Sequence, residues 1–168
     1  GGIIAFVTSK GTLDKKNSSV RRYISERADF LGAMRLPNTI FVSSANTEVT
    51  SDVIFLQKKQ VPSIETQEFE TVENTDRGIL LNSYYITHPE MLLGHMEVDE
   101  KRFGPDRALS YLAPNYGENL KDAIAEAVER LPKNVFYKVQ QNTDKKNENT
   151  GDIIPADSSI KNYTYVVR

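Results

Sequence analysis

The stretch that decides the fold is Gly1–Ser9, GGIIAFVTS, read together with two later apolar segments. Ile3–Val7 is a short continuous apolar run, which is typical of a strand buried on both faces of a parallel sheet. Phe30–Leu36 (FLGAMRL) predicts a second strand. Pro37 ends that strand because proline lacks the backbone N–H that a ladder requires. Thr50–Gln57 (TSDVIFLQ) predicts a third strand.

A helix is expected between the first two strands. Asn17 or Ser18 can cap it, and it would run over residues 19–28 with Val20, Tyr23 and Ile24 on one face. The order strand–helix–strand–strand predicts the edge half of a doubly wound α/β sheet, in which the last two strands can be antiparallel. The fold class expected for residues 1–60 is therefore α/β, with a partial Rossmann-like sheet.

The rest of the chain changes character after residue 60. Residues 61–78 are acidic and weakly patterned, and they indicate an extended connector. Residues 79–168 predict a small mixed α+β region, whose clearest element is a helix over Glu118–Leu131 with one apolar stripe. Weaker patterns predict a short helix over 89–93, a turn at 102–105, a polar loop at 140–152, and strands at 96–98, 135–139 and 160–167.

Composition limits the classes of protein. Hydrophobic residues make up 39% and charged residues 26%, which is typical of a globular protein. No apolar run is long enough to cross a bilayer, so we expect a cytoplasmic chain without a membrane partner. The absence of cysteine excludes disulfides, thiolate metal ligands and a cysteine nucleophile.

Charge is distributed unevenly along the chain. Residues 1–60 contain nine Lys and Arg against five Asp and Glu, whereas the remainder is acidic overall. A basic half suggests a polyanionic partner such as DNA, and a solvated surface of mixed sign is the alternative.

Three polar residues follow the first strand at a place where open α/β sheets bind ligands: Ser9, Lys10 and Thr12. An ordinary polar loop is the competing interpretation.

Phe41 lies in the loop between the second and third strands, where it is either buried or presents its ring for stacking on an unpaired base. His88 and His95 are about two helical turns apart, but Gly94 interrupts the helix and no carboxylate pair completes a zinc site.

Common catalytic motifs are missing. The sequence has no phosphate-binding loop, no Gly-x-Gly-x-x-Gly and no Gly-x-Ser-x-Gly elbow. An unrelated α/β hydrolase is therefore disfavoured.

The first sixty residues resemble the C-terminal part of the catalytic domain of N6-adenine DNA methyltransferases, in the branch of type I modification subunits and mobile-element methylase–helicase proteins. The segments that carry the resemblance are Gly1–Ser9, Ser19–Ile24, Leu31–Phe41 and Thr47–Lys59. Tyr84–Gly94 is similar to the downstream region of the mobile-element proteins.

The resemblance implies a seven-stranded fold that transfers a methyl group from S-adenosylmethionine to a flipped adenine. It also implies that Phe41 faces the flipped base and that a helicase domain belongs to the same parent chain. With DNA as the partner, the basic residues Lys10, Arg21 and Arg22 are candidates to meet the DNA backbone. The family's Gly-containing cofactor loop and its Asn/Asp-Pro-Pro-Phe/Tyr motif are absent from this sequence. Both precede the matching strand in family order, so we expect a fragment that does not bind the cofactor by itself.

Two further expectations remain. A chain cut before Ile3–Val7 would expose the edge of its first strand and would self-associate there. The alternative to a methyltransferase fragment is a non-catalytic DNA-binding or protein-interaction module that uses the same half-fold.

Overall fold

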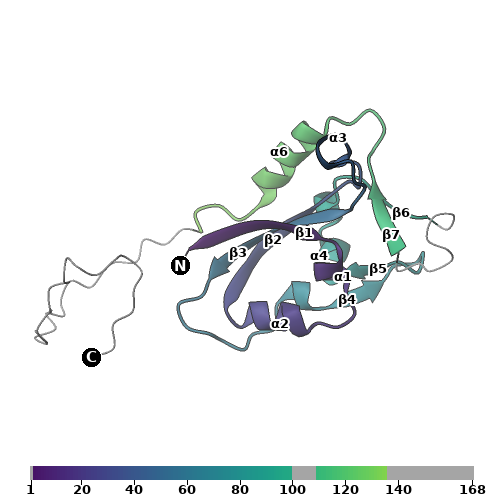
Figure 1. The fold of residues 1–168 in the computed structure, drawn as a ribbon. Helices are drawn as coiled ribbons and strands as arrows, with labels where there is room; N and C mark the ends of the chain where they lie inside the picture. Colours follow the sequence, from purple (N-terminus) through teal and green to yellow (C-terminus); the bar gives the residue numbers. More distant parts are fainter. Residues whose placement is uncertain (1, 100–108, 136–168) are drawn as a thin grey trace, which may run out of the picture. The chain divides into compact units, whose positions relative to one another are not determined.

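The computed structural model describes residues 2–99 and 109–135, which belong to one compact unit. Its central sheet has three strands, β1 (Ile3–Ser9), β2 (Ala28–Leu36) and β3 (Ser51–Lys58), in the order β1-β3-β2 (Figure 1). The middle strand β3 pairs antiparallel with both neighbours. The prediction that the last two strands are antiparallel is confirmed. The coarse class, mixed α and β, is also found. The Rossmann-like sheet expected for residues 1–60 is not confirmed, because every ladder between the described strands is antiparallel.

The environment predicted for the first strand is wrong. Ile3, Ile4 and Val7 are 43%, 52% and 56% exposed, and among the first strand's apolar residues Phe6 is the one that packs against the core. β1 is an edge strand of this sheet and pairs with β3 alone among the described strands. A continuous apolar run predicts burial on both faces only when neighbours cover both faces, and here they do not.

Short elements surround the sheet. They are α1 (Gly11–Asp14), α2 (Ser19–Ser25), α3 (Val42–Ala45), η1 (Glu68–Glu70), α4 (Ser83–Thr87), η2 (Pro89–Met91) and α6 (Leu120–Arg130). Ser18 is the N-cap residue of α2 and makes no side-chain capping hydrogen bond, while Ser19 N donates to Asn17 Oδ1 at 2.9 Å just before the helix. α6 confirms the predicted C-terminal helix and is capped by Asn119, whose Oδ1 accepts from Lys121 N at 3.0 Å.

Residues 61–78 are more structured than the predicted connector. They contain η1 and β4 (Val72–Asn74), which pairs antiparallel with β5 (Leu80–Asn82) of the following region. A second hairpin pairs β6 (His95–Val98), a predicted strand, with β7 (Ser110–Ala113). The boundaries predicted at residues 60 and 78 do not separate packing units, because the core cluster includes Ile54, Phe69 and Leu81 together. The patterns at 102–105, 136–139, 140–152 and 160–167 lie outside the described residues.

A β-bulge in β2 brings later parts of the chain close to the sheet. The register with β3 shifts between Phe30 and Gly32, and Gly32 has a φ of 137°. A Cβ at this position would lie 2.7 Å from Leu131 Cδ2 and 3.1 Å from the Tyr84 hydroxyl. Gly32 therefore permits a backbone conformation and a close approach that other residues would not.

A fully buried arginine joins the sheet to α1. Arg35 Nε and Nη2 donate to the two carboxylate oxygens of Asp52 at 2.7 and 2.9 Å. Arg35 Nη1 and Nη2 donate to those of Asp14 at 2.6 and 3.0 Å. Burial opposes the charge of Arg35, but the two carboxylates outweigh it, so its pKa lies well above the ordinary value.

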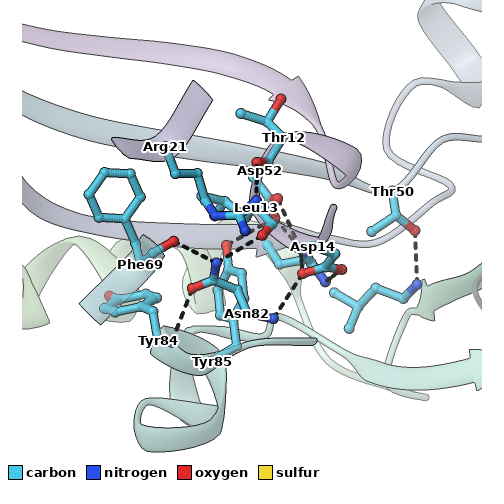
Figure 2. Close-up of polar contacts among 12 residues, drawn as sticks. Thr12, Leu13, Asp14, Arg21, Thr50, Asp52, Phe69, Asn82, Tyr84 and Tyr85 are labelled. Carbon is cyan, nitrogen blue, oxygen red and sulfur yellow. Dashed lines mark hydrogen bonds and ion pairs between the residues drawn. The ribbon is translucent and has the colours of Figure 1, made fainter. Parts of the chain in front are cut away.

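The same cluster extends to the segment around Asn82. Asn82 N donates to Asp14 Oδ1 at 3.0 Å, and its carboxamide nitrogen donates to the carbonyls of Leu13 and Phe69 (Figure 2). Its carboxamide oxygen accepts from Tyr84 N at 3.1 Å and so caps α4. Tyr85 OH donates to Asp52 at 2.9 Å, and burial raises the pKa of Tyr85 well above its ordinary value. Residues from three parts of the sequence thus share one polar core.

The exposed edge of β1 predicts association of the chain with itself. Substitution Val7→Lys places a charge on this edge and should lower the apparent mass at high protein concentration, because lysine on an edge strand opposes strand pairing. Sedimentation velocity over a concentration series measures the effect. Val20→Lys, on α2 and similarly exposed at 59%, is the matched control and should associate like the native chain. A native chain that is monomeric at every concentration would contradict the prediction.

Candidate functional site

A cavity of about 400 Å³ opens beside the ends of the three central strands. Ser9 and Lys10 follow β1, Asn38 follows β2, and Thr50 precedes β3. These ends meet at one edge of the sheet because β1 and β2 both run opposite to β3, and Ser9 and Leu36 both pair with Ser51. The complete lining consists of Ser9, Lys10, Gly11, Asn38, Glu48, Val49, Thr50, Asp99, Leu109, Ser110 and Tyr111.

Backbone hydrogen bonds fix the sheet side of the cavity. Lys10 N donates to the Thr50 carbonyl at 3.1 Å, which holds the start of α1 against the start of β3. Val49 N donates to the Asn38 carbonyl at 2.9 Å, which ties the loop after β2 to the segment before β3. Main-chain contacts thus hold the backbone at Lys10, Asn38 and Thr50.

Strand β7 supplies the opposite wall and is attached through Leu112. Asn38 N donates to the Leu112 carbonyl at 2.8 Å, and Leu112 N donates to Thr50 Oγ1 at 2.8 Å. Figure 2 shows Thr50 and this contact apart from the Asp14–Asn82 cluster. The Leu112 side chain is fully buried. The wall formed by β7 is thus bonded directly to the ends of β2 and β3.

Two polar side-chain atoms of the lining lack hydrogen-bond partners. Within the described part of the chain, Asn38 Oδ1 and Ser110 Oγ are buried and make no hydrogen bond, and Ser110 is only 2% exposed. A buried polar group without a partner costs about 1–3 kcal/mol. Neither atom is accessible to solvent, and two further buried atoms without partners, Arg21 Nη2 and Ser25 Oγ, lie away from this cavity. The cavity is therefore a candidate site because of its volume and its place at the strand ends.

The cavity also contains charged groups. Lys10, Glu48 and Asp99 line it, and each is engaged in an interaction with other groups of the protein. Burial lowers the pKa of Lys10, and Arg35 adds to this effect, while Asp14 and Asp52 oppose it. Both signs of charge are therefore present, which suits a ligand with polar edges better than a strongly anionic one.

The structure separates the three residues predicted after the first strand. Ser9 and Lys10 line the cavity, whereas Thr12 lies in a neighbouring cleft of about 410 Å³ together with Lys15, Asn17 and Ser19. The Thr12 hydroxyl is 2.6 Å from the hydroxyl of Thr8. Ser9 lines both spaces and marks the boundary between them.

The two arginines predicted to meet DNA have different environments. Arg22 is exposed, as a phosphate contact requires. Arg21 is 1% exposed, and its Nε donates to the carbonyl of Glu70 at 3.0 Å. Its Nη1 donates to the carbonyl of Thr12 at 3.2 Å (Figure 2). Burial lowers the pKa of Arg21. The role predicted for Arg21 is therefore corrected: its guanidinium ties α2 to η1 and α1 and does not face solvent.

Phe41 lies beside the cavity region but does not line it. It immediately precedes α3, its carbonyl accepts from Ala45 N at 2.8 Å, and its side chain is half-buried. The loop after β2 thus contributes Asn38 to the lining, while part of the Phe41 ring remains accessible.

The two histidines are not brought together on one helix. His88 follows α4, with its ring 3.6 Å from Glu68 and 3.4 Å from Glu90. His95 begins β6, and its Nδ1 is 3.1 Å from Asn115 Oδ1. Among residues 2–99 and 109–135, no group of three His, Asp or Glu side chains is placed to hold a metal ion. In the same ranges no helix has the length and apolar character needed to cross a bilayer.

Comparisons with models of protein families, with curated proteins and with solved structures find no match to this chain. We therefore base the functional proposal on the fold, the cavity and the resemblance of the first sixty residues.

Sequence reasoning found part of this site. Ser9 and Lys10 could be selected because they follow an apolar strand. Asn38 and Ser110 were missed, because an Asn after a proline and a Ser before a tyrosine are ordinary loop and strand residues. A possible signal for Asn38 was its position directly after the second strand, at the same edge of the sheet as Ser9. No sequence signal indicated that β7 would reach this edge.

The attachment of β7 to the cavity is tested at Thr50. Substitution Thr50→Val removes the acceptor for Leu112 N and should lower the free energy of unfolding by about 1–3 kcal/mol, because a buried N–H loses its partner. Amide hydrogen exchange at Leu112 should accelerate more than exchange within β1.

Thr50→Ser is the matched control, since it keeps the hydroxyl and should retain most of the protection at Leu112. Equal exchange at Leu112 in the native chain and the valine variant would contradict the assigned contact.

Proposed function

We propose that this chain is part of an N6-adenine DNA methyltransferase and forms the side of its catalytic domain that holds the target base. One observation carries the proposal. Three of the four segments of residues 1–60 that resemble the family meet at a single cavity: Gly1–Ser9 contributes Ser9, Leu31–Phe41 contributes Asn38, and Thr47–Lys59 contributes Thr50. Segments related to one function are expected to converge on one site, whereas unrelated likenesses would be scattered over the fold.

The sheet supports the same proposal. The resemblance implies a doubly wound sheet whose last strands can be antiparallel, and β2 and β3 pair in this way. Ligands of open α/β sheets bind outside the carboxyl ends of strands, and β1 and β2 both end at the cavity. In this proposal the exposed strand β1 would pair with a further strand of the complete catalytic domain.

The roles proposed for individual residues follow from their environments. Phe41 would stack on the flipped adenine with the accessible part of its ring. Arg22, exposed on α2, and Lys10, at the cavity, would meet the DNA backbone. S-adenosylmethionine would be bound by other parts of the parent protein, because this sequence contains neither the Gly-containing cofactor loop nor the Asn/Asp-Pro-Pro-Phe/Tyr motif. A helicase domain in the parent and a cytoplasmic location belong to the same proposal.

A methyl-transfer assay on the protein encoded by the complete reading frame tests the function. Incorporation of labelled methyl groups into DNA should be detectable, and Phe41→Ala should lower the turnover about 5- to 150-fold, because stacking on a base contributes about 1–3 kcal/mol. Tyr116→Ala is the control, since Tyr116 is fully exposed and should be dispensable. For the 168-residue chain alone, calorimetry with S-adenosylmethionine should detect no binding.

Two results would contradict the proposal. Micromolar binding of S-adenosylmethionine to the 168-residue chain would show a cofactor site that the proposal assigns elsewhere. Binding of DNA by the complete protein without any methyl transfer would favour the alternative, a non-catalytic DNA-binding module.

A further inference from the structure

We propose that the cleft between the end of β1 and α2 binds a small phosphate monoester, such as a sugar phosphate. The lining of this cleft consists of Ser9, Gly11, Thr12, Lys15, Asn17, Ser19 and Val20. Only Ser9 and Gly11 also line the cavity of the proposed function. The site is independent of that function, and it gives a role to Thr12, which the proposed function leaves unassigned.

The charge of the cleft has one sign. Lys15 is exposed, lines the cleft and makes no ion pair or side-chain hydrogen bond within the described part of the chain. Among the described residues, no Asp or Glu lines this cleft. The one carboxylate of α1, Asp14, is buried and accepts two hydrogen bonds from Arg35. The cleft therefore attracts an anion, whereas the neighbouring cavity contains both signs of charge.

A buried cation lies behind the same wall. Arg21 Nη1 donates to the Thr12 carbonyl (Figure 2), and its Nε donates to the Glu70 carbonyl. Its Nη2 has no hydrogen-bond partner among the described residues, so no carboxylate of these residues is hydrogen-bonded to this guanidinium. The charge of Arg21 acts through the wall without touching a ligand, and it adds to the positive potential that Lys15 creates.

The cleft also presents neutral donors that solvent reaches. Ser9, Asn17 and Ser19 are exposed, and the half-buried Thr12 hydroxyl lies 2.6 Å from that of Thr8. Asn17 Oδ1 accepts from Ser19 N at 2.9 Å, which leaves the Nδ2 group of its carboxamide as a donor. An ammonium group beside amide and hydroxyl donors suits the three terminal oxygens of a phosphate monoester better than the two oxygens of a carboxylate.

The size and lining of the cleft indicate the rest of the ligand. A volume of about 410 Å³ is in the range of small-molecule sites and exceeds what a phosphoryl group alone fills. Val20 supplies apolar surface, and among the described residues no aromatic side chain lines the cleft. A polar organic part such as a sugar therefore fits this lining better than a nucleobase, which binds by stacking on aromatic rings.

Titration of the 168-residue chain with glucose 6-phosphate, followed by two-dimensional ¹H–¹⁵N NMR, tests the site. Binding should occur with a Kd of about 1 mM or tighter, with shifts at the amides of Gly11, Lys15 and Ser19. Glucose lacks the phosphoryl group and should bind about tenfold more weakly, because the charge-assisted hydrogen bonds are lost. Inorganic phosphate should compete for the same amides.

Two substitutions assign the binding to this cleft. Lys15→Gln removes the charge, and Asn17→Asp replaces the Nδ2 donor with a carboxylate oxygen while keeping an oxygen for Ser19 N. Each should weaken glucose 6-phosphate binding about tenfold, and both positions are exposed, so the fold should be retained. Lys58→Gln at the far end of β3 and Asn74→Asp in β4 make the same changes elsewhere and should bind like the native chain.

Four results would overturn the assignment. The first three are equal affinity for glucose and glucose 6-phosphate, native affinity in both Lys15→Gln and Asn17→Asp, and no binding of glucose 6-phosphate at about 10 mM. The fourth concerns a single-stranded oligonucleotide without a terminal phosphate. If it binds the same amides more tightly than glucose 6-phosphate does, the cleft recognises the phosphodiester backbone of a nucleic acid and not a monoester.

Discussion

The buried guanidinium of Arg35 is the constraint on which the rest of this structure depends. A charge with no solvent exposure is tolerated only when opposite charges satisfy it, and the carboxylate oxygens of Asp14 and Asp52 accept four hydrogen bonds from the Arg35 guanidinium. The backbone of Arg35 takes part as well, because its carbonyl accepts from Leu93 N at 3.0 Å. One residue of β2 thus holds α1, β3 and the segment after η2.

This arrangement explains why the later part of the chain belongs to the site. Asp14 binds the backbone of Asn82, so the segment that contains β5 and α4 is fixed against α1. Leu93, held by Arg35, leads directly into β6, whose partner β7 carries Ser110. The cavity therefore lies between the sheet ends and a hairpin that the ion cluster helps to position. Its two walls come from sequence regions that composition alone assigned to different domains.

The sequence predicted the helices and strands better than it predicted which of their residues are buried. The three central strands, α2 and α6 could all be predicted, because the sequence patterns that indicate them extend over only a few residues. Burial depends on distant neighbours, so Ile3–Val7 was expected to be covered on both faces and Arg21 was expected to face solvent. The role of Arg35 could not be predicted either, because an arginine within FLGAMRL forms its ion pairs only when the fold brings Asp14 and Asp52 beside it. Ser9 and Lys10 were found by a rule about strand ends, whereas Asn38 and Ser110 required the tertiary structure.

The most direct test of this account is the free energy of unfolding of Arg35→Met, measured with urea and accompanied by amide exchange at Asn82 and Leu93. Two buried carboxylates would lose their partner, so stability should fall by about 3–5 kcal/mol. Protection at Asn82 should decrease, because its acceptor Asp14 loses the Arg35 guanidinium, whereas Leu93 N keeps its acceptor, the backbone carbonyl of residue 35. Arg22→Met, at an exposed position on the neighbouring helix, should change stability by less than about 0.5 kcal/mol. A loss below about 1 kcal/mol for Arg35→Met, with native protection at Asn82, would contradict the central role of this cluster.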